Sequence, residues 1–339
     1  MLNRKKIVIV LCFMLLLVTM LVSISFAEGI QLKFQHLGSA NHPWQKGAEF
    51  IGKELAARSK GRITMNIYPA GVLCGLNWKI NVEQVQTGVV DMLVEWNGAY
   101  SNLVPELLIN HTPFLYDSLD HQMRFLSEYP EVLWKQLGKL EELDLKPIGV
   151  WPRPARQHIN SKRLVRTPED VKGITLRVPD VKYFINVVRD LGMTPLPLPS
   201  GEIYTAIQMG RVDGEDNSIS TIYDFKTYEV AKYLTVWNYI PDLAIISMNK
   251  ALWNSLSKED QILIHDVVRD SMKVVFEIEK KAQENAIEKM EEAGVKFAFL
   301  TEEELVPFKN LIKPAKEEIK NLVGEDDFNS FIEAVEVAK

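Results

Sequence analysis

Cysteine is scarce in this 339-residue chain, which contains only Cys12 and Cys74. Cys12 lies in an apolar run near the N-terminus, follows the bulky Leu11 and has no small residue beside it, which argues against a lipid anchor. If the segment that holds Cys12 is removed on export, Cys74 is left alone and no intramolecular disulfide can form. The stability of the chain must then come from its apolar cores.

Sequence motifs of catalysis and of metal binding are also missing. The chain has no G-x-S-x-G, phosphate-binding loop, dinucleotide fingerprint or H-E-x-x-H. None of the histidines stands at metal-ligand spacing, and the acidic group Asp213, Glu215 and Asp216 lacks the twelve-residue pattern of a calcium loop. We therefore expect no metal, no cofactor and no catalytic residue.

The one long apolar run lies at the start of the chain. Arg4, Lys5 and Lys6 precede the run 7–22, and Ser25-Phe26-Ala27 offers small residues for cleavage, so residues 1–27 are predicted to be a cleavable signal peptide for export to the periplasm. The alternative is an uncleaved membrane anchor, although the run is shorter than the ~20 residues that span a bilayer. Cleavage leaves 39 − 3 = 36 basic against 45 acidic residues, a net charge of −9, which argues against nucleic acid as a partner.

The length, with 47% hydrophobic and 25% charged residues, indicates a globular protein of about two domains. Alternating apolar residues predict strands at 30–37 and 63–68, with a helix between them. This strand–helix–strand order favours a parallel α/β sheet. Near 258–293 the apolar residues recur at helical spacing, which predicts a helix long enough to cross both domains.

The Pro-rich tract 151–156 and Pro241-Asp242 mark two crossings between the predicted domains. We expect strand 146–150 to end before the first tract, and strands 233–240 and 243–249 to be separated by the second. Residues 28–153 with 243–282 are assigned to domain I, and 154–242 with 283–339 to domain II.

A candidate anion site lies in the second domain. Arg177 alternates with Leu176 and Val178 in a predicted strand that Pro179 ends, so its guanidinium points away from the face that its neighbours bury. Arg156 ends another extended segment, and Asn217 is expected in a loop after a helix. Two guanidinium groups and an amide can hold a carboxylate. The alternative for each arginine is a surface ion pair.

The first domain offers the facing wall. A predicted strand at 91–95 ends in Glu95, and Trp96 begins an aromatic loop at its carboxyl end, where ligands bind in open α/β sheets. The polar loop from His36 to His42, which includes Asn41, follows the first strand. These residues are candidate pocket walls, with packing in the core as the alternative.

Several stretches closely resemble the substrate-binding proteins of tripartite ATP-independent periplasmic (TRAP) transporters. They are TPEDVKGITLRVPD at 167–180, LGMTPLPLPSGEIYTAIQMGRVDGEDN at 191–217 and YEVAKYLTVWNYI at 228–240, with HPWQKGAEF, YPAGVL, EQVQTGVVDM and VPELLINHTPFLY before them. The resemblance implies a two-domain periplasmic-binding-protein-like α/β fold with hinge strands and a long domain-spanning helix. It also implies a protein that captures a small organic acid and delivers it to a TRAP membrane permease, as a monomer and without catalysis.

The resemblance assigns the ligand carboxylate to Arg177, with Arg156 and Asn217 as its partners. The chain departs from the family pattern at Leu76 or Asn77, where a glutamate is common, at Ser218, and at Tyr239, where histidine is frequent. The predicted ligand-binding residues are Arg156, Arg177, Asn217, Trp96, His36, Asn41, Tyr239 and Glu95. Two other function classes stay open: an exported enzyme such as a lyase that holds a carboxylate with the same arginines, and a structural or sensory partner protein.

Overall fold

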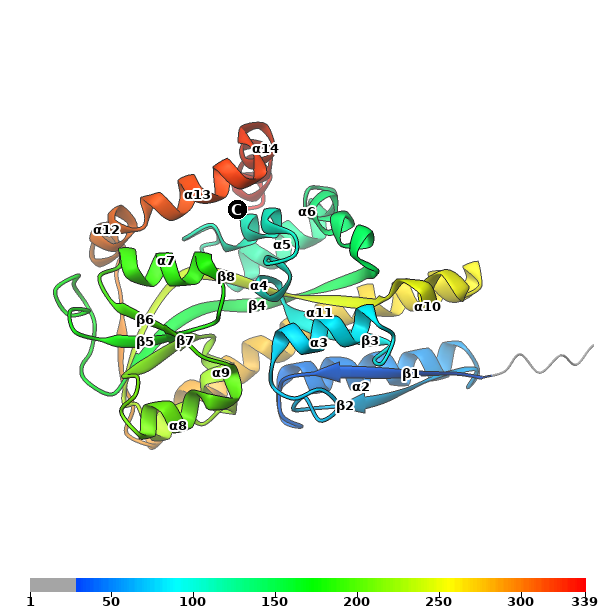
Figure 1. The fold of residues 1–339 in the computed structure, drawn as a ribbon, viewed down its shortest axis with the longest axis horizontal. Coiled ribbons are helices and arrows are strands. Elements are labelled where there is room, and N and C mark those ends of the chain that lie inside the picture. The colour runs from blue at the N-terminus through cyan, green and yellow to red at the C-terminus, as the bar shows by residue number, and fades with distance from the viewer. Residues whose placement is uncertain (1–28) are drawn as a thin grey trace, which may run out of the picture.

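The structure is a computed structural model, and it describes residues 29–339. The predicted signal peptide lies outside the described residues. The described chain folds around one nine-stranded sheet with the strand order β2-β1-β3-β8-β4-β7-β5-β6, and β9 pairs with β8. Figure 1 shows the sheet running through the whole molecule, with helices along it.

One end of the sheet is the parallel unit that the sequence predicts. β1 pairs in parallel with both β2 and β3. The apolar side chains of α2, Ala48, Ile51 and Leu55, are fully buried, so the predicted strand–helix–strand order is confirmed. The elements here are β1 (Ile30–His36), α2 (Pro43–Arg58), β2 (Ile63–Tyr68), α3 (Trp78–Gln86), β3 (Met92–Trp96) and α4 (Asn97–Tyr100).

Two long strands cross the centre of the sheet. β4 (Leu145–Asn160) and β8 (Tyr233–Asn249) pair antiparallel along nearly their whole length. The prediction that the strands break at 151–156 and at Pro241 is wrong, because both strands continue through these prolines. The pairing of β4 with β8 changes register on either side of Arg156, and such irregularities tolerate residues that cannot donate to the ladder.

The other end of the sheet contains β5, the strand that carries Arg177. β5 pairs in parallel with β6 and β7, and β7 pairs antiparallel with β4. Asn217 is the last residue of β7, so its predicted place in a loop is wrong. The elements here are β5 (Thr175–Val178), α7 (Lys182–Asp190), β6 (Thr194–Pro197), η3 (Ser200–Glu202), α8 (Ile203–Gln208), β7 (Gly214–Asn217), α9 (Ile219–Asp224), η4 (Thr227–Glu229) and β9 (Lys296–Phe299).

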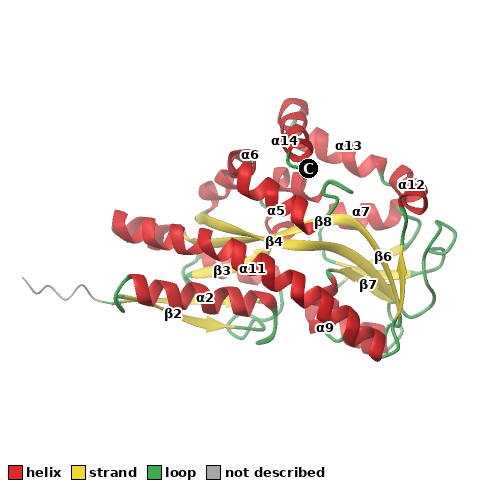
Figure 2. Ribbon diagram, turned by 180° about the vertical axis from the view of Figure 1, so that it is seen from behind, coloured by secondary structure: helices red, strands yellow, loops and turns green. Residues whose placement is uncertain are grey.

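The long helix is confirmed as α11 (Lys258–Glu292). It packs on α2 at one end and on α9 at the other, and Figure 2 shows it lying across both ends of the sheet. Its buried face includes Ile264, Val268, Val275 and Met290, at the expected helical spacing.

The helices α5, α6, α12, α13 and α14 lie on the side of the molecule that carries α7, whereas α10 lies at the opposite end of the sheet (Figure 1). α13 packs on η1 and α7, and α14 packs on α5 and α6. The last helices thus contact elements from both predicted domains, and the domain boundaries stay a prediction. The elements are η1 (Pro105–His111), α5 (Leu119–Glu128), α6 (Pro130–Leu137), η2 (Gly138–Leu143), α10 (Lys250–Ser255), α12 (Glu302–Leu311), α13 (Lys313–Val323) and α14 (Glu325–Val337).

Candidate functional site

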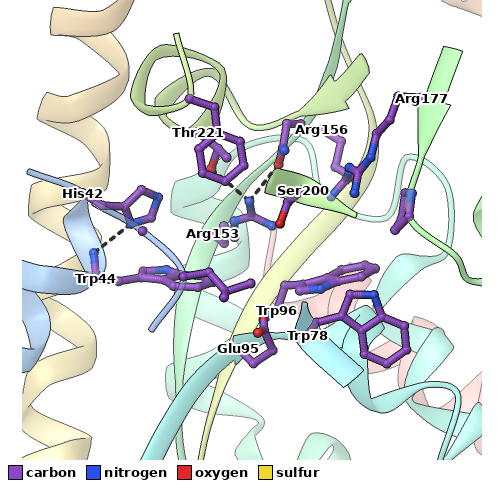
Figure 3. Close-up of a pocket in the computed structure, with 15 residues that line it drawn as sticks. His42, Trp44, Trp78, Glu95, Trp96, Arg153, Arg156, Arg177, Ser200 and Thr221 are labelled. Atoms are coloured by element: carbon purple, nitrogen blue, oxygen red, sulfur yellow. Dashed lines mark hydrogen bonds between the residues drawn. The ribbon is translucent and has the colours of Figure 1, made fainter. Parts of the chain in front are cut away.

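A cavity lies where the two ends of the sheet meet, with an empty volume of about 540 Å³ including its mouth. Figure 3 shows three guanidinium groups on one side, with Trp44 and Trp96 across from them. The lining residues are Leu37, Gly38, His42, Trp44, Trp78, Glu95, Trp96, Arg153, Arg156, Arg177, Pro179, Ser200, Asn217, Thr221 and Phe225.

Arg177 lies on β5 and is only 4% exposed. Among the described residues its guanidinium makes one hydrogen bond, from Nε to the carbonyl oxygen of Leu198 (2.8 Å). Burial lowers the pKa of Arg177 to about 10, against the charge of Glu215 on β7, so the group stays charged at neutral pH. Its two terminal nitrogens form no ion pair within the described chain, and they are therefore free to bind an anion.

Arg156 lies on β4 and is fully engaged by carboxylates. Its Nε donates to Oδ2 of Asp216 (2.6 Å), and Nη2 donates to Oδ1 (3.1 Å) and to the carbonyl oxygen of Asp216 (2.6 Å). Nη1 donates to Asp242 (3.3 Å). Burial opposes the charged form of Asp216, but the charge and hydrogen bonds of Arg156, together with the hydrogen bond from Tyr239, outweigh it and lower the pKa of this carboxyl. The cation of Arg156 is thus largely neutralised by the protein itself.

A third arginine, Arg153, lies in the cavity wall and was not predicted. It pairs with Asp242 of β8, and Nη2 donates to Oδ1 of Asn217 (2.9 Å) and Oγ1 of Thr221 (3.0 Å). Residues three apart on a regular strand face opposite sides of the sheet. The register shift between Arg153 and Arg156 adds a residue to β4, and both side chains line the cavity as a result.

Aromatic rings complete the wall. The guanidinium of Arg153 lies 5.6 Å from the ring centroid of Trp44, and that of Arg156 lies 5.6 Å from Trp96. The Trp96 ring folds over Gly98, where a Cβ atom would come within 1.8 Å of ring atom Cζ3. Only glycine at this position lets Trp96 take its place. Cation–π contacts of this kind favour arginine in a desolvated wall.

The cavity also holds two titratable side chains outside any ion pair. His42 caps α2 and its Nδ1 accepts a hydrogen bond from the backbone N–H of Trp44 (3.1 Å). Burial and the charge of Arg153 lower the pKa of His42 well below its usual value, so the ring is neutral and carries its proton on Nε2. Burial raises the pKa of Glu95 to about 8. At neutral pH, both groups present uncharged polar atoms.

Three predicted site residues lie outside the lining. His36 ends β1, fully buried, with Nε2 bound to the side-chain oxygen of Gln45 (2.9 Å). Asn41 is exposed. Tyr239 is buried on β8, and its hydroxyl donates to Oδ2 of Asp216 (2.7 Å), so it holds the carboxylate that pairs with Arg156. The other predicted residues, Arg156, Arg177, Asn217, Trp96 and Glu95, lie together in the lining.

Some of the lining residues that were not predicted lie next to predicted ones in the sequence, and others do not. His42 and Trp44 belong to the loop and helix start next to the predicted His36–His42 wall, so the neighbourhood was right and the members differ. Thr221 lies four residues after Asn217, on the first turn of α9. Trp78 and Ser200 come from two loop ends that meet only in the folded chain, and no local pattern points to them.

The two sides of the cleft touch at its rims. The backbone N–H of Ser39 donates to Oδ2 of Asp224 on α9 (3.1 Å), and its hydroxyl also bonds to this carboxylate. At the other rim, Ser200 Oγ donates to the carbonyl oxygen of Leu76 (3.0 Å), and Lys79 pairs with Asp180. The described conformation is therefore closed over the cavity.

Comparison with known proteins assigns the family. The model of the bacterial extracellular solute-binding protein family 7 (DctP) matches residues 34–321. The chain belongs to this family. It is 29% identical to a solute-binding protein of Roseobacter denitrificans, over 70% of this chain and 72% of that protein. It is 25% identical to the 2,3-diketo-L-gulonate-binding periplasmic protein YiaO of Escherichia coli, over 78% and 79%.

Solved structures agree with this family. A TRAP periplasmic solute-binding protein from Ralstonia eutropha, bound to (S)-2-acetolactate, superposes on the solute-binding protein described here with a TM-score of 0.84. The two are 28% identical, and the match covers 90% of this chain and 98% of the other. The resemblance to TRAP substrate-binding proteins and the two-domain α/β fold are thus confirmed. Proteins of this family bind solutes outside the cytoplasm, and no helix among residues 29–339 is long and apolar enough to cross a membrane.

Proposed function

We propose that this solute-binding protein captures a small organic acid in the cavity between its two domains, with the ligand carboxylate held by Arg177. The observation that carries the proposal is the contrast between the arginines. Arg153 and Arg156 already pair with Asp242 and Asp216, whereas Arg177 has no ion pair among the described residues. A buried cation is costly without a partner, and a ligand carboxylate supplies one through a bidentate fork.

Arg156 and Asn217 have supporting roles in this proposal. Arg156, held in place by Asp216 and Asp242, forms the wall behind the ligand. Asn217 orients the site because its amide joins Arg153 to Glu215. Trp96 and Glu95 form the facing wall. Tyr239 acts one step away from the ligand through Asp216, and His36 acts through the loop that it begins. Asn41 lies in this same loop and would contribute to the rim of the cleft.

The captured acid is delivered to a TRAP membrane permease. We propose a monomer that is exported by a cleaved signal peptide, works in the periplasm and does not bind nucleic acid, since the mature chain carries a net charge of −9 (36 basic minus 45 acidic residues). The two domains that close on the ligand are residues 28–153 with 243–282 and residues 154–242 with 283–339. Arg153 of β4 pairs with Asp242 of β8, and these two residues lie at the two proposed domain boundaries, which supports this division.

The ligand leaves the protein chemically unchanged. A lyase would need a general acid or base beside the ligand, and Glu95 and His42 are the side chains of the lining that a reaction could use. The family consists of binding proteins, which favours capture alone.

A thermal-shift screen against carboxylates tests the proposal. Keto acids, dicarboxylates, sugar acids and amino acids are each compared with the amide of the same compound. An acid at 100 times its dissociation constant adds about 2.7 kcal/mol to the free energy of unfolding, and the uncharged amide adds far less. Each mixture is then examined by proton NMR after overnight incubation. Stabilisation by the amides as well as the acids would contradict the carboxylate grip, and new ligand signals would favour the lyase.

A further inference from the structure

Two buried polar atoms in the cavity wall have no hydrogen-bond partner within the described chain. They are Oε2 of Glu95 and Nε of Arg153. Both side chains line the same cavity and are 0% and 5% exposed, respectively. Buried polar groups in native proteins are nearly always bonded, and an exception in a binding cavity marks a place for a ligand atom.

The surroundings of Glu95 determine which of its oxygens is available. Glu95 lies on β3, and its Oε1 accepts the backbone N–H of Trp96 (3.0 Å). The carbonyl oxygen of a neutral carboxyl is its better acceptor, so the bond to Oε1 places the proton of the neutral acid on Oε2. Oε2 is the atom without a partner. The neutral carboxyl therefore has a hydroxyl donor without a partner among the described residues, on a side chain that lines the cavity.

The charges that face Glu95 come from each strand beside it. Arg153 on β4 favours its ionised form, and Asp242 on β8 opposes it. Arg153 is already paired with Asp242, so little net charge is left to ionise Glu95. Asn81 on α3 and the backbone N–H of Trp96 also favour the ionised form, and Tyr100 on α4 faces the carboxyl as well. Burial dominates and raises the pKa to about 8, which keeps the proton on Glu95 at neutral pH.

We propose that Glu95 binds the ligand as an uncharged carboxylic acid, donating from Oε2 to a hydroxyl or carbonyl oxygen that the ligand carries apart from its carboxylate. This inference rests on the proposed function, in which Arg177 holds the carboxylate. Nε of Arg153 donates to the same region of the ligand. The protein thus selects hydroxy acids and oxo acids.

Other ligand classes fit this wall poorly. An unsubstituted chain would leave both polar atoms buried and unpaired, and sites that bond a ligand oxygen reject analogues without it strongly. A ligand ammonium group would find no ionised carboxylate to pair with among the described residues of the lining, because Glu95 is neutral and the carboxylates of Asp216 and Asp242 are held by Arg156 and Arg153. Both amino acids and plain fatty acids are therefore expected to bind weakly.

Matched ligands provide the first test. D-galactonate, D-galacturonate and 2-hydroxy-2-methyl-3-oxobutanoate are each compared by calorimetry with the unsubstituted acid of the same carbon number. We expect every oxygenated acid that binds to exceed its unsubstituted partner by at least about 30-fold. Equal binding of the two, or tighter binding of an amino acid, would overturn the inference.

The pH dependence of binding provides the second test, and it requires a protein with the carboxyl removed. Because the neutral acid is the binding form, affinity falls about tenfold between pH 7 and pH 9 for a group with a pKa near 8. In Glu95→Gln, which cannot ionise, the ratio of the affinity at pH 7 to the affinity at pH 9 approaches one. Glu279→Gln removes another buried carboxyl, outside the lining, and should keep the tenfold ratio. A ratio near one in the unmodified protein would overturn the inference.

A measurement without ligand makes the account independent of the compounds chosen. The infrared difference spectrum between the unmodified protein and Glu95→Gln at pH 7 should contain the band of a protonated carboxyl, and at pH 10 that of a carboxylate. A carboxylate band at pH 7 would exclude the neutral donor. Failure of the proposed function looks different, because Arg177→Lys would then leave the affinity for the oxygenated acids unchanged whatever Glu95 does.

Discussion

At the scale of residues, the cavity separates charges that the protein neutralises from charges that it leaves for a ligand. Arg153 and Arg156 are held by Asp242 and Asp216, and these ion pairs fix the positions of both side chains. Arg177 is equally buried but has only the Leu198 carbonyl as partner. The difference predicts that the three arginines respond differently to substitution, although each is part of the same wall.

Glu279 predicts a pH effect on stability. This carboxyl on α11 is 0% exposed, and burial raises its pKa to about 7. Between its usual pKa and this value the unfolded chain binds fewer protons than the folded protein, so the free energy of unfolding falls as pH rises. Glu279→Gln should therefore be the more stable protein at pH 8, by up to about 3 kcal/mol in urea denaturation, with the advantage below about 1 kcal/mol at pH 5.

Glu277→Gln is the matched control, because Glu277 is exposed on the same helix. Its effect should stay within about 0.5 kcal/mol at both pH values. An advantage of Glu279→Gln that is the same at pH 5 and pH 8 would show that the carboxyl is not the source.

The sequence predicts single residues well where the local backbone is regular. Arg177 was found because alternation in a short strand gives its direction directly. Arg153 was missed because strand alternation places it on the opposite face from Arg156, and only the register shift in β4 brings the two together. The neutral state of Glu95 could not be read from its neighbours in sequence, since Asp242 and Arg153 come from distant strands.

At the scale of elements, β4 and β8 carry both the sheet and the site. The sequence predicted their segments and the long helix, but divided the strands at prolines. The paired register continues through Pro152 and through Asp242, and the strands therefore form one continuous connection between the two ends of the sheet. In the proposed function, a ligand held by Arg177 would lie against Arg153 and Arg156, which belong to β4 of this connection.

A substitution at Asp242 tests how much the stability of the paired strands β4 and β8 depends on their buried charges. It is fully buried and pairs with both Arg153 and Arg156. Asp242→Asn leaves these cations without their shared partner, and the free energy of unfolding should fall by about 3–5 kcal/mol. Chemical denaturation measures the loss. Asp266→Asn, at a more exposed pair on α11, serves as control and should change stability by less than about 0.5 kcal/mol; equal effects would contradict the account.

At the scale of the whole molecule, the rims of the cleft predict a closing motion. The contact of Ser39 with Asp224 joins the loop after β1 to α9 across the mouth of the cleft, and we expect it to break when the cleft opens. Ligand contacts on both sides would shift the population toward this state. The fold and the family were predictable from the sequence, but the rim contacts were not, because they join segments 185 residues apart.

Asp224→Ala tests this motion. Loss of the rim contact should weaken acid binding by about 3- to 10-fold, and small-angle X-ray scattering at equal acid concentration should show a larger radius of gyration than for the unmodified protein. Asp266→Ala is the control, since Asp266 lies away from the cleft on α11. An unchanged affinity and radius in Asp224→Ala would mean that this contact does not hold the cleft closed.

The carboxylate grip of Arg177 is the central claim, and titration calorimetry on Arg177→Lys tests it most directly. Lysine keeps the charge but lacks the planar fork, so the affinity for the best acid of the screen should fall at least about tenfold, and Arg177→Ala should lose at least about 100-fold. Arg211→Lys, at an exposed arginine, is the matched control and should bind as the unmodified protein does. Undiminished binding by Arg177→Lys and Arg177→Ala would contradict the account.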